Sequence, residues 1–340
     1  MTPKERHIKK IINDPANVLA EMNRGFAAAY RDIVELHDDP LYVCRAGGAV
    51  TGKVGVISGG GSGHEPLGGG YVGRGMLSAA APGAFFSSPT PDQILAATQA
   101  ADGGAGVLHL ILNYTGDILN FETGAELADL EGIPITTVVI NDDVAVENST
   151  WTAGRRGVAG AIVAFKLAGA AADRGDDLET VTRIAAKANE NMATMGLALS
   201  ACTVPTVGKP SFELEDNEME LGIGVHGEPG VKRVPMMKAD DIVDVLLDAT
   251  VKDLAIERGE DVLLYINGLG ATPLCEQYIM YNRAADRLAD LGVNVTRSQI
   301  GNFFTSLEMA GASLTVMRLD DELTGLYDAP VHTAGWRAGI

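Results

Sequence analysis

Two histidines in glycine-rich surroundings are the residues of this sequence best suited to chemistry. His64 lies in the run 58–66, SGGGSGHEP, and His226 lies in the run 222–230, GIGVHGEPG. A core histidine normally has bulky neighbours, whereas flanking glycines leave an imidazole open to a ligand. We therefore expect both histidines to face one substrate. A packing role for either one alone is the alternative, and a zinc site is not expected because no Cys or His pair has ligand spacing.

Asp117 is the third candidate, because it follows an apolar run of strand length, 107–112, and begins a helical pattern. One interpretation is structural: an aspartate in the first turn of a helix accepts from free N–H groups and interacts favourably with the helix dipole. The other is a general base that takes a proton from a substrate hydroxyl. Asp142 and Asp143 follow the next predicted strand, and we expect them to be loop carboxylates rather than metal ligands.

Neither glycine-rich segment of the first half fits a nucleotide-binding loop. The run 47–53 ends in Lys53 like a P-loop, but Val54 follows in place of Ser or Thr, and the lysine leads into a predicted strand instead of a helix. The glycines of 58–66 are followed by a proline and more glycines, where a dinucleotide-binding fold needs a helix. The sequence therefore predicts no cofactor bound by this chain, and it argues against an NAD-dependent oxidoreductase.

The elements that must position these residues alternate between strands and helices. The apolar runs 53–57, 107–112 and 133–140 indicate strands buried on both faces, which is typical of a parallel α/β sheet. Further strands are expected at 41–45, 219–225, 262–267, 293–299 and 313–319. Helices are expected at 14–36, 93–101, 118–130, 156–174, 177–192, 239–254 and 273–291.

Proline and glycine interrupt this pattern between residues 201 and 210, where we expect a domain boundary. The prediction is two α/β domains with mainly parallel sheets, 1–200 and 201–340. His64 and Asp117 belong to the first domain and His226 to the second, so the active site is expected at their interface.

Composition and charge exclude several classes of function. The 340 residues are 46% hydrophobic, as in a packed globular protein, and the formal net charge of −19 opposes binding to nucleic acid or to an anionic membrane surface. Cys44, Cys202 and Cys275 are odd in number and far apart, as expected for reduced, mostly buried thiols. No apolar signal segment follows the N-terminus, and the apolar stretch 157–172 is short and interrupted by Lys166. We expect a cytoplasmic protein with a buried helix at that stretch.

A series of motifs extends these observations from one end of the chain to the other. They lie at 10–14, 58–66, 87–92, 113–117, 120–122, 142–146, 152–158, 202–205, 208–212, 222–230, 270–274 and 328–333. In type and order these motifs resemble those of the substrate-binding subunit of dihydroxyacetone kinase. The resemblance covers the whole chain, and it implies an α/β phosphotransferase subunit that acts on a short hydroxyketone.

The resemblance also implies a role for each candidate. His226 would attack the ketone of dihydroxyacetone and hold it as a hemiaminal, a reaction for which a neutral imidazole is a competent nucleophile. Asp117 would be the base on the hydroxyl that receives phosphate, and His64 would hydrogen-bond the substrate and assist proton transfer. The remaining substrate contacts would come from Gly61, Ser62 and Gly63.

The same resemblance implies that catalysis is shared between subunits. The nucleotide, ADP or ATP with Mg²⁺, is expected on a separate helical L-type subunit, because no fused nucleotide-binding domain is expected after 328–333. In many bacterial systems a phosphotransferase-system protein that draws on phosphoenolpyruvate recharges that nucleotide. Family members also suggest a homodimer.

Leu112 departs from the family pattern, which commonly has Lys at this position near the substrate. Losing an ammonium group removes donors and charge that would contact a small polar ligand. One alternative is therefore a kinase subunit for another hydroxyketone, such as a ketotetrose. A second is a hydroxyketone sensor that regulates transcription without turnover. The combination of His64, Asp117 and His226 favours the enzyme, because a sensor needs capture but no base.

Overall fold

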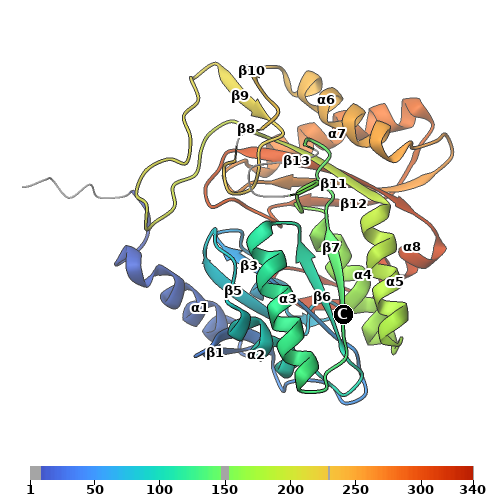
Figure 1. Cartoon of the computed structure of the whole chain (residues 1–340). Coiled ribbons are helices and arrows are strands. Elements are labelled where there is room, and N and C mark those ends of the chain that lie inside the picture. Colours follow the sequence, from blue (N-terminus) through green and yellow to red (C-terminus); the bar gives the residue numbers. More distant parts are fainter. Residues whose placement is uncertain (1–8, 147–152, 229, 340) are drawn as a thin grey trace, which may run out of the picture.

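The described residues form two six-stranded sheets and a small three-stranded sheet, with helices packed around them (Figure 1). The computed structural model describes residues 9–146, 153–228 and 230–339, so His7, Thr152 and Pro229 lie outside the described residues. Among the helices of the described ranges, none has the length and apolar character needed to cross a membrane.

The first sheet has the strand order β1-β2-β5-β3-β6-β7. Its strands are β1 (Val34–Asp38), β2 (Leu41–Arg45), β3 (Gly55–Ser62), β5 (Ala79–Phe85), β6 (Val107–Leu112) and β7 (Ile135–Ile140). The strands β5, β3, β6 and β7 are parallel, and β1 and β2 add an antiparallel edge. Every residue of β6 is buried, which explains why its sequence is apolar except for His109.

Helices cover both faces of the first sheet. Successive residues of a strand point to opposite faces, and accordingly Leu108 belongs to one hydrophobic core and Val107 to another. The core with Val107 lies under α2 (Pro91–Ala101) and α3 (Thr115–Leu130). The core with Leu108 lies under α4 (Ala161–Arg174) and α5 (Leu178–Glu190). Helix α1 (Val18–Ala29), with the short helix η1 (Pro15–Asn17) before it, packs beside β1.

The second sheet has the strand order β10-β9-β8-β13-β11-β12. Its strands are β8 (Met192–Ala198), β9 (Glu218–Leu221), β10 (Lys232–Pro235), β11 (Asp261–Gly268), β12 (Asn294–Gly301) and β13 (Gly311–Leu319). One face packs under α6 (Ala239–Leu254) and α7 (Leu274–Leu291). The other face contributes residues such as Tyr265 and Met317 to the core that contains Leu108, so the two sheets share that core.

The end of the chain returns to the first half. After α8 (Asp321–Asp328), strand β14 (Val331–Thr333) pairs on one side with β15 (Arg337–Ala338) and on the other with β4 (Gly73–Arg74). Strand β4 follows the short helix η2 (Gly69–Tyr71), a few residues beyond His64. The C-terminal segment therefore ties the second sheet to the region of the first candidate histidine.

Local sequence signals explain where the main helices begin and end. Thr90 and Gln93 form a capping box at the start of α2, and the side chain of Asp177 accepts the N–H of Thr180 at 2.8 Å at the start of α5. Gly175 and Gly292 end α4 and α7 in the left-handed conformation, with φ of 93° and 74°. Helix α4 is nearly all buried, including Lys166, whose ammonium donates to the carbonyl of Leu326 at 2.6 Å.

The structure confirms the α/β class and corrects several details. The helix predicted at 14–36 ends at Ala29, because the chain turns there into the unpredicted strand β1. The expected parallel pairing holds for β5, β3, β6 and β7, whereas in the second sheet only β11 and β12 are parallel. That sheet is antiparallel elsewhere because β13 runs between β8 and β11 and against both of them.

The glycine run at 58–62 is strand rather than loop, since β3 continues through Ser62. Glycine is needed there because neighbouring backbone approaches closely. A Cβ on Gly59 would lie 2.7 Å from the carbonyl oxygen of Ala81, and one on Gly61 would lie 2.6 Å from the amide nitrogen of Ser87. The run therefore brings bare backbone, instead of side chains, to the carboxyl end of the sheet.

Sheet membership changes between α5 and β8, before the predicted boundary at 201–210. The division into 1–200 and 201–340 stays a prediction, and the shared core together with β14 links the two parts.

Candidate active site

Segments that come from the two sheets meet at one cavity of about 690 Å³. Asp117 and Tyr114 come from the start of α3, beyond the carboxyl end of β6, and Gly61 comes from β3. His226 lies in the turn after β9 of the second sheet. The imidazole of His64 lies beside that of His226, with ring centroids 4.8 Å apart and planes at 78°. The three candidates from different parts of the sequence are thus brought together.

The carboxylate of Glu228 orients the ring of His226. One oxygen of Glu228 lies 3.0 Å from His226 Nδ1, and the other accepts the backbone N–H of His226 at 2.9 Å. Burial alone would raise the pKa of Glu228, but the hydrogen bond and charge at His226, with the charge at Arg156, lower it to about 2. Because an ionised carboxylate only accepts, Nδ1 of His226 is the donor, and in the neutral form of the ring Nε2 has the lone pair.

His64 has the same tautomer for a different reason. Its Nδ1 lies 2.8 Å from the carbonyl oxygen of Thr305, which can only accept, so Nδ1 is the donor. Burial first, and then the charge at His226, lowers the pKa of His64 to about 3, and the ring is neutral near pH 7. Its Nε2 is buried without a partner among the described residues. The ring, stacked on Phe86 at 4.9 Å, therefore offers an acceptor for a hydroxyl.

Asp117 lies in the first turn of α3, where no described hydrogen bond joins its side chain to a backbone N–H of that helix. Oδ1 of its carboxyl group is buried with no partner within the described residues. Burial raises the pKa of Asp117 to about 6, although Ser88 and the charge at His226 oppose the shift. A buried carboxylate with a free oxygen and a pKa near neutrality has the properties of a general base. This geometry favours the chemical interpretation of Asp117 over the structural one.

A buried ion pair supports the loop that carries His226. The fully buried guanidinium of Arg156 donates from Nε to Asp143 at 2.7 Å and from Nη2 to the carbonyl oxygen of Gly222 at 2.7 Å. The side chains of Glu228 and Arg156 both contact Gly224 and leave no room for a side chain there. A Cβ at this position would lie 1.9 Å from Glu228 Oε2 and 2.7 Å from Arg156 Nη1. The positive charge of Arg156 thus lies close behind the Glu228 carboxylate and helps to keep it ionised.

The residues predicted to make the remaining substrate contacts differ in their surroundings. Gly61 lines the cavity, but the Ser62 hydroxyl donates to the carbonyl of Gly83 at 2.7 Å, and the N–H of Gly63 donates to Glu65 at 3.0 Å. Leu112 is buried in the core shared by the two sheets. Roles for Ser62 and Gly63 in substrate binding therefore stay predictions.

Glu228, Arg156 and Tyr114 are site residues that sequence reasoning did not single out. The position of Glu228, two residues after His226, was a usable signal, because an acid so close can reach the imidazole. Tyr114 forms a wall of the site, with its ring centroid 4.7 Å from that of His226 and nearly perpendicular to it. Asp142 and Asp143 are loop carboxylates as expected: Asp142 accepts the N–H groups of two residues ahead of α4, and Asp143 pairs with Arg156.

An α/β protein with a paired histidine and carboxylate and a buried aspartate at the interface of two sheets has the groups needed for nucleophilic and general-base chemistry on a small ligand. The chain belongs to the Dak1 domain family, whose model matches residues 24–335. It is 49% identical to the PEP-dependent dihydroxyacetone kinase, dihydroxyacetone-binding subunit DhaK, of Escherichia coli, over 96% of this chain and 98% of that protein. It is 40% identical to an L-erythrulose 1-kinase of Mycolicibacterium smegmatis, over 97% of this chain and 58% of that protein.

Solved structures agree with this assignment. The dihydroxyacetone kinase of C. freundii is 33% identical and superposes with a TM-score of 0.87 over 97% of this chain and 60% of that one. The dihydroxyacetone kinase operon co-activator Dha-DhaQ is 31% identical, with a TM-score of 0.87 over 93% of this chain and 98% of that one. The resemblance inferred from the motifs is therefore confirmed.

Proposed function

We propose that this chain is the dihydroxyacetone-binding subunit of a dihydroxyacetone kinase, and that it captures the ketone on His226. The observation that carries the proposal is the pair of His226 and Glu228, which leaves Nε2 as a free nucleophile beside a cavity that also contains Asp117. Nε2 attacks the carbonyl carbon, a C–N bond forms, and the carbonyl π bond breaks. The oxygen takes a proton from solvent, and the imidazolium that forms is stabilised by the adjacent Glu228 carboxylate.

Asp117 and His64 act on the hydroxyl groups of the captured ketone. Asp117 removes the proton of the hydroxyl that receives phosphate, and Nε2 of His64 accepts a hydrogen bond from the substrate. Phosphoryl transfer depends mainly on positioning and charge stabilisation, so a subunit that holds and aims one hydroxyl supplies a large part of the catalysis.

The phosphoryl group is proposed to come from a helical partner subunit that carries ADP or ATP with Mg²⁺. Curated relatives described as PEP-dependent or PTS-dependent support a phosphotransferase-system protein as its source. We further propose that the chain works as a cytoplasmic homodimer.

Reconstitution tests this proposal. Purified chain is incubated with dihydroxyacetone and a nucleotide-carrying partner subunit, and dihydroxyacetone phosphate is measured with a phosphotransferase-system donor or with ATP. We expect product only when chain and partner are both present. Absence of product with every partner and donor would reject the kinase function, and product from chain and ATP alone would reject the need for a partner.

Glu228→Gln tests the orienting role of that carboxylate. An amide has no negative charge to stabilise the imidazolium that forms when the ketone is captured. Hydrogen bonds to charged groups contribute about 1.5–3 kcal/mol. We expect capture of the ketone to weaken by about 10- to 100-fold, with partial recovery in Glu228→Asp. Titration followed by the carbon-13 signal of the labelled carbonyl measures this. Equal affinity in Glu228→Gln and the unmodified chain would contradict the role.

The structural match to a co-activator and the match to an L-erythrulose kinase support two alternatives, a sensor and a kinase subunit for a ketotetrose. Comparing turnover of dihydroxyacetone with that of L-erythrulose in the reconstituted system distinguishes the substrates. Capture without turnover of any hydroxyketone would favour the sensor.

A further inference from the structure

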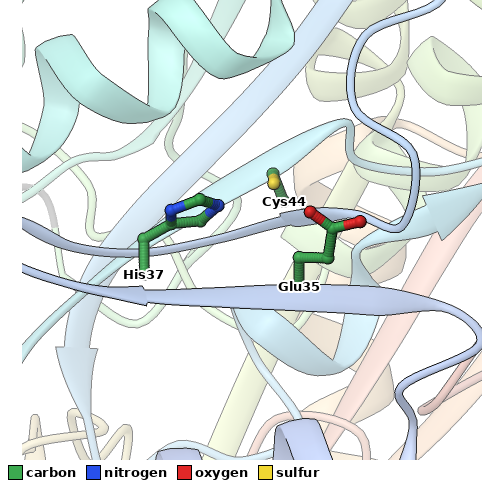
Figure 2. Close-up of side chains that lie close together, drawn as sticks. All are labelled: Glu35, His37 and Cys44. Atoms are coloured by element: carbon green, nitrogen blue, oxygen red, sulfur yellow. The ribbon is translucent and has the colours of Figure 1, made fainter.

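The hairpin of β1 and β2, at the edge of the first sheet, carries three side chains of metal-binding type that the proposed reaction does not use. They are Glu35, His37 and Cys44, and their ligand atoms all lie within 4.8 Å of one another. Figure 2 shows the carboxylate, the imidazole and the thiol close together above the two strands.

The register of the hairpin explains this grouping. Glu35 pairs directly with Cys44 across the two strands, and His37 lies two residues further along β1, on the same face as Glu35. His37 in turn faces Tyr42, and the two rings stack with centroids 4.3 Å apart and planes at 5°. Three different donor types are thus presented on one side of a regular hairpin.

Two of the three ligands are already oriented. The N–H of Gly47 donates to Glu35 Oε1 at 2.9 Å, which leaves the second carboxylate oxygen available. Stacking on Tyr42 restricts the ring of His37. Interactions of this kind behind a metal ligand fix its direction and increase the affinity of the site.

The donor set selects the kind of ion. Mg²⁺ and Ca²⁺ take oxygen ligands, whereas a thiolate with an imidazole and a carboxylate suits Zn²⁺. With metal–ligand bonds of about 2.0–2.3 Å, ligand atoms around a tetrahedral ion lie roughly 3.5 Å apart. The ligand atoms, which now lie within 4.8 Å of one another, therefore have to move closer by about 1 Å to bind an ion. Glu35 and His37 are exposed, so an ion can enter and a water can fill the fourth position.

We propose that Glu35, His37 and Cys44 bind one Zn²⁺ ion that cross-links β1 to β2. Zn²⁺ displaces the thiol proton and forms a Zn–S bond, with the proton released to solvent.

Cobalt spectroscopy tests the proposal. The full-length chain without a purification tag is stripped with chelator, kept reduced with a phosphine, and titrated with Co²⁺. We expect a thiolate-to-cobalt charge-transfer band in the near ultraviolet that saturates at one ion per chain and disappears when Zn²⁺ is added. Zn²⁺ is also expected to raise the thermal midpoint of the unmodified chain.

Variants identify the ligands. His37 is exposed, so His37→Gln should fold, and we expect at least about 10-fold weaker Zn²⁺ binding. Cys44→Ser should lose the charge-transfer band, while Cys275→Ser, which removes the exposed free thiol on α7, should keep it. Absence of a band in the unmodified chain would overturn the proposal. A band that persists in both Cys44→Ser and His37→Gln would also overturn it, because the ion would then lie elsewhere.

Discussion

His226→Ala is expected to abolish covalent capture of dihydroxyacetone and to lower the rate of phosphorylation by roughly three orders of magnitude or more. Alanine removes the Nε2 lone pair that forms the C–N bond, and none of the neighbouring groups replaces it. His64 is close, but it is a buried residue that does not line the cavity, and its proposed contact with the substrate is a hydrogen bond only. Ketone labelled with carbon-13 at the carbonyl shows capture directly, since the carbon changes from trigonal to tetrahedral.

His332→Ala is the matched control for that experiment. His332 lies on β14, outside the cavity, and its backbone pairs with β4. We expect this variant to capture the ketone like the unmodified chain. If His226→Ala keeps its circular dichroism spectrum and still shows a tetrahedral ketone carbon, His226 is not the nucleophile.

Asp117→Asn is expected to lower the rate of phosphorylation by about 10²- to 10⁴-fold, the usual contribution of a general base, while leaving capture on His226 intact. The amide matches the carboxylate in shape but cannot take a proton from the substrate hydroxyl. Asp92→Asn is the control, because Asp92 also lies in the first turn of a helix, α2, and is exposed. Equal losses in the two variants would favour a helix-dipole role for Asp117 and contradict the base.

The pH dependence of the rate gives a second test of Asp117. The base must be ionised, and burial raises its pKa to about 6. The rate of the reconstituted enzyme should therefore rise about tenfold per pH unit below pH 6 and level off above it. This acidic limb should be absent from the residual activity of Asp117→Asn. An unchanged limb in the variant would assign it to another group.

Asp117 should also reduce the stability of the chain near neutral pH. The pKa of Asp117 is higher in the folded chain than in the unfolded chain. The folded state is therefore favoured when the pH lies below the ordinary pKa of an aspartate, and this stability is lost as the pH rises through about 6. A pKa shift of about two units corresponds to a loss of up to about 3 kcal/mol in the free energy of unfolding, which Asp117→Asn would restore. Asp117→Asn should therefore unfold at a higher temperature than the unmodified chain at pH 7, and the difference should vanish near pH 4.

Periodic and capped elements were predictable from the sequence, whereas small-residue strands were not. Helices α2, α6 and α7 have clear apolar spacing and end signals, and their predicted ranges agree with the structure. Strands β5 and β8 read AAAPGAF and MATMGLA, with none of the β-branched residues that mark strands except one threonine. Their strand conformation comes from pairing with distant segments, and the antiparallel direction of the second sheet has the same origin.

The candidate site was predictable from the sequence where glycines flank a histidine. Glycines around His64 and His226 indicated approachable imidazoles, and the structure places the two rings together. Arg156 was not predictable as a supporting residue, because its buried position depends on Asp143 before it and on the Gly222 carbonyl far along the chain. Charge in a sequence does not reveal burial when the partners are brought in by tertiary contacts.

The shared core and the pairing of β14 with β4 have a consequence for substrate length. His226 follows a strand of the second sheet and Asp117 follows a strand of the first, so the distance between the proposed nucleophile and the proposed base is set by how the two sheets pack together. This distance constrains only the part of the substrate between the carbonyl carbon and the hydroxyl that receives phosphate. It sets no limit on carbons on the other side of the carbonyl, for which the size of the cavity, about 690 Å³, is the constraint. A ketose longer by one carbon at that end would be phosphorylated at the same hydroxyl as dihydroxyacetone.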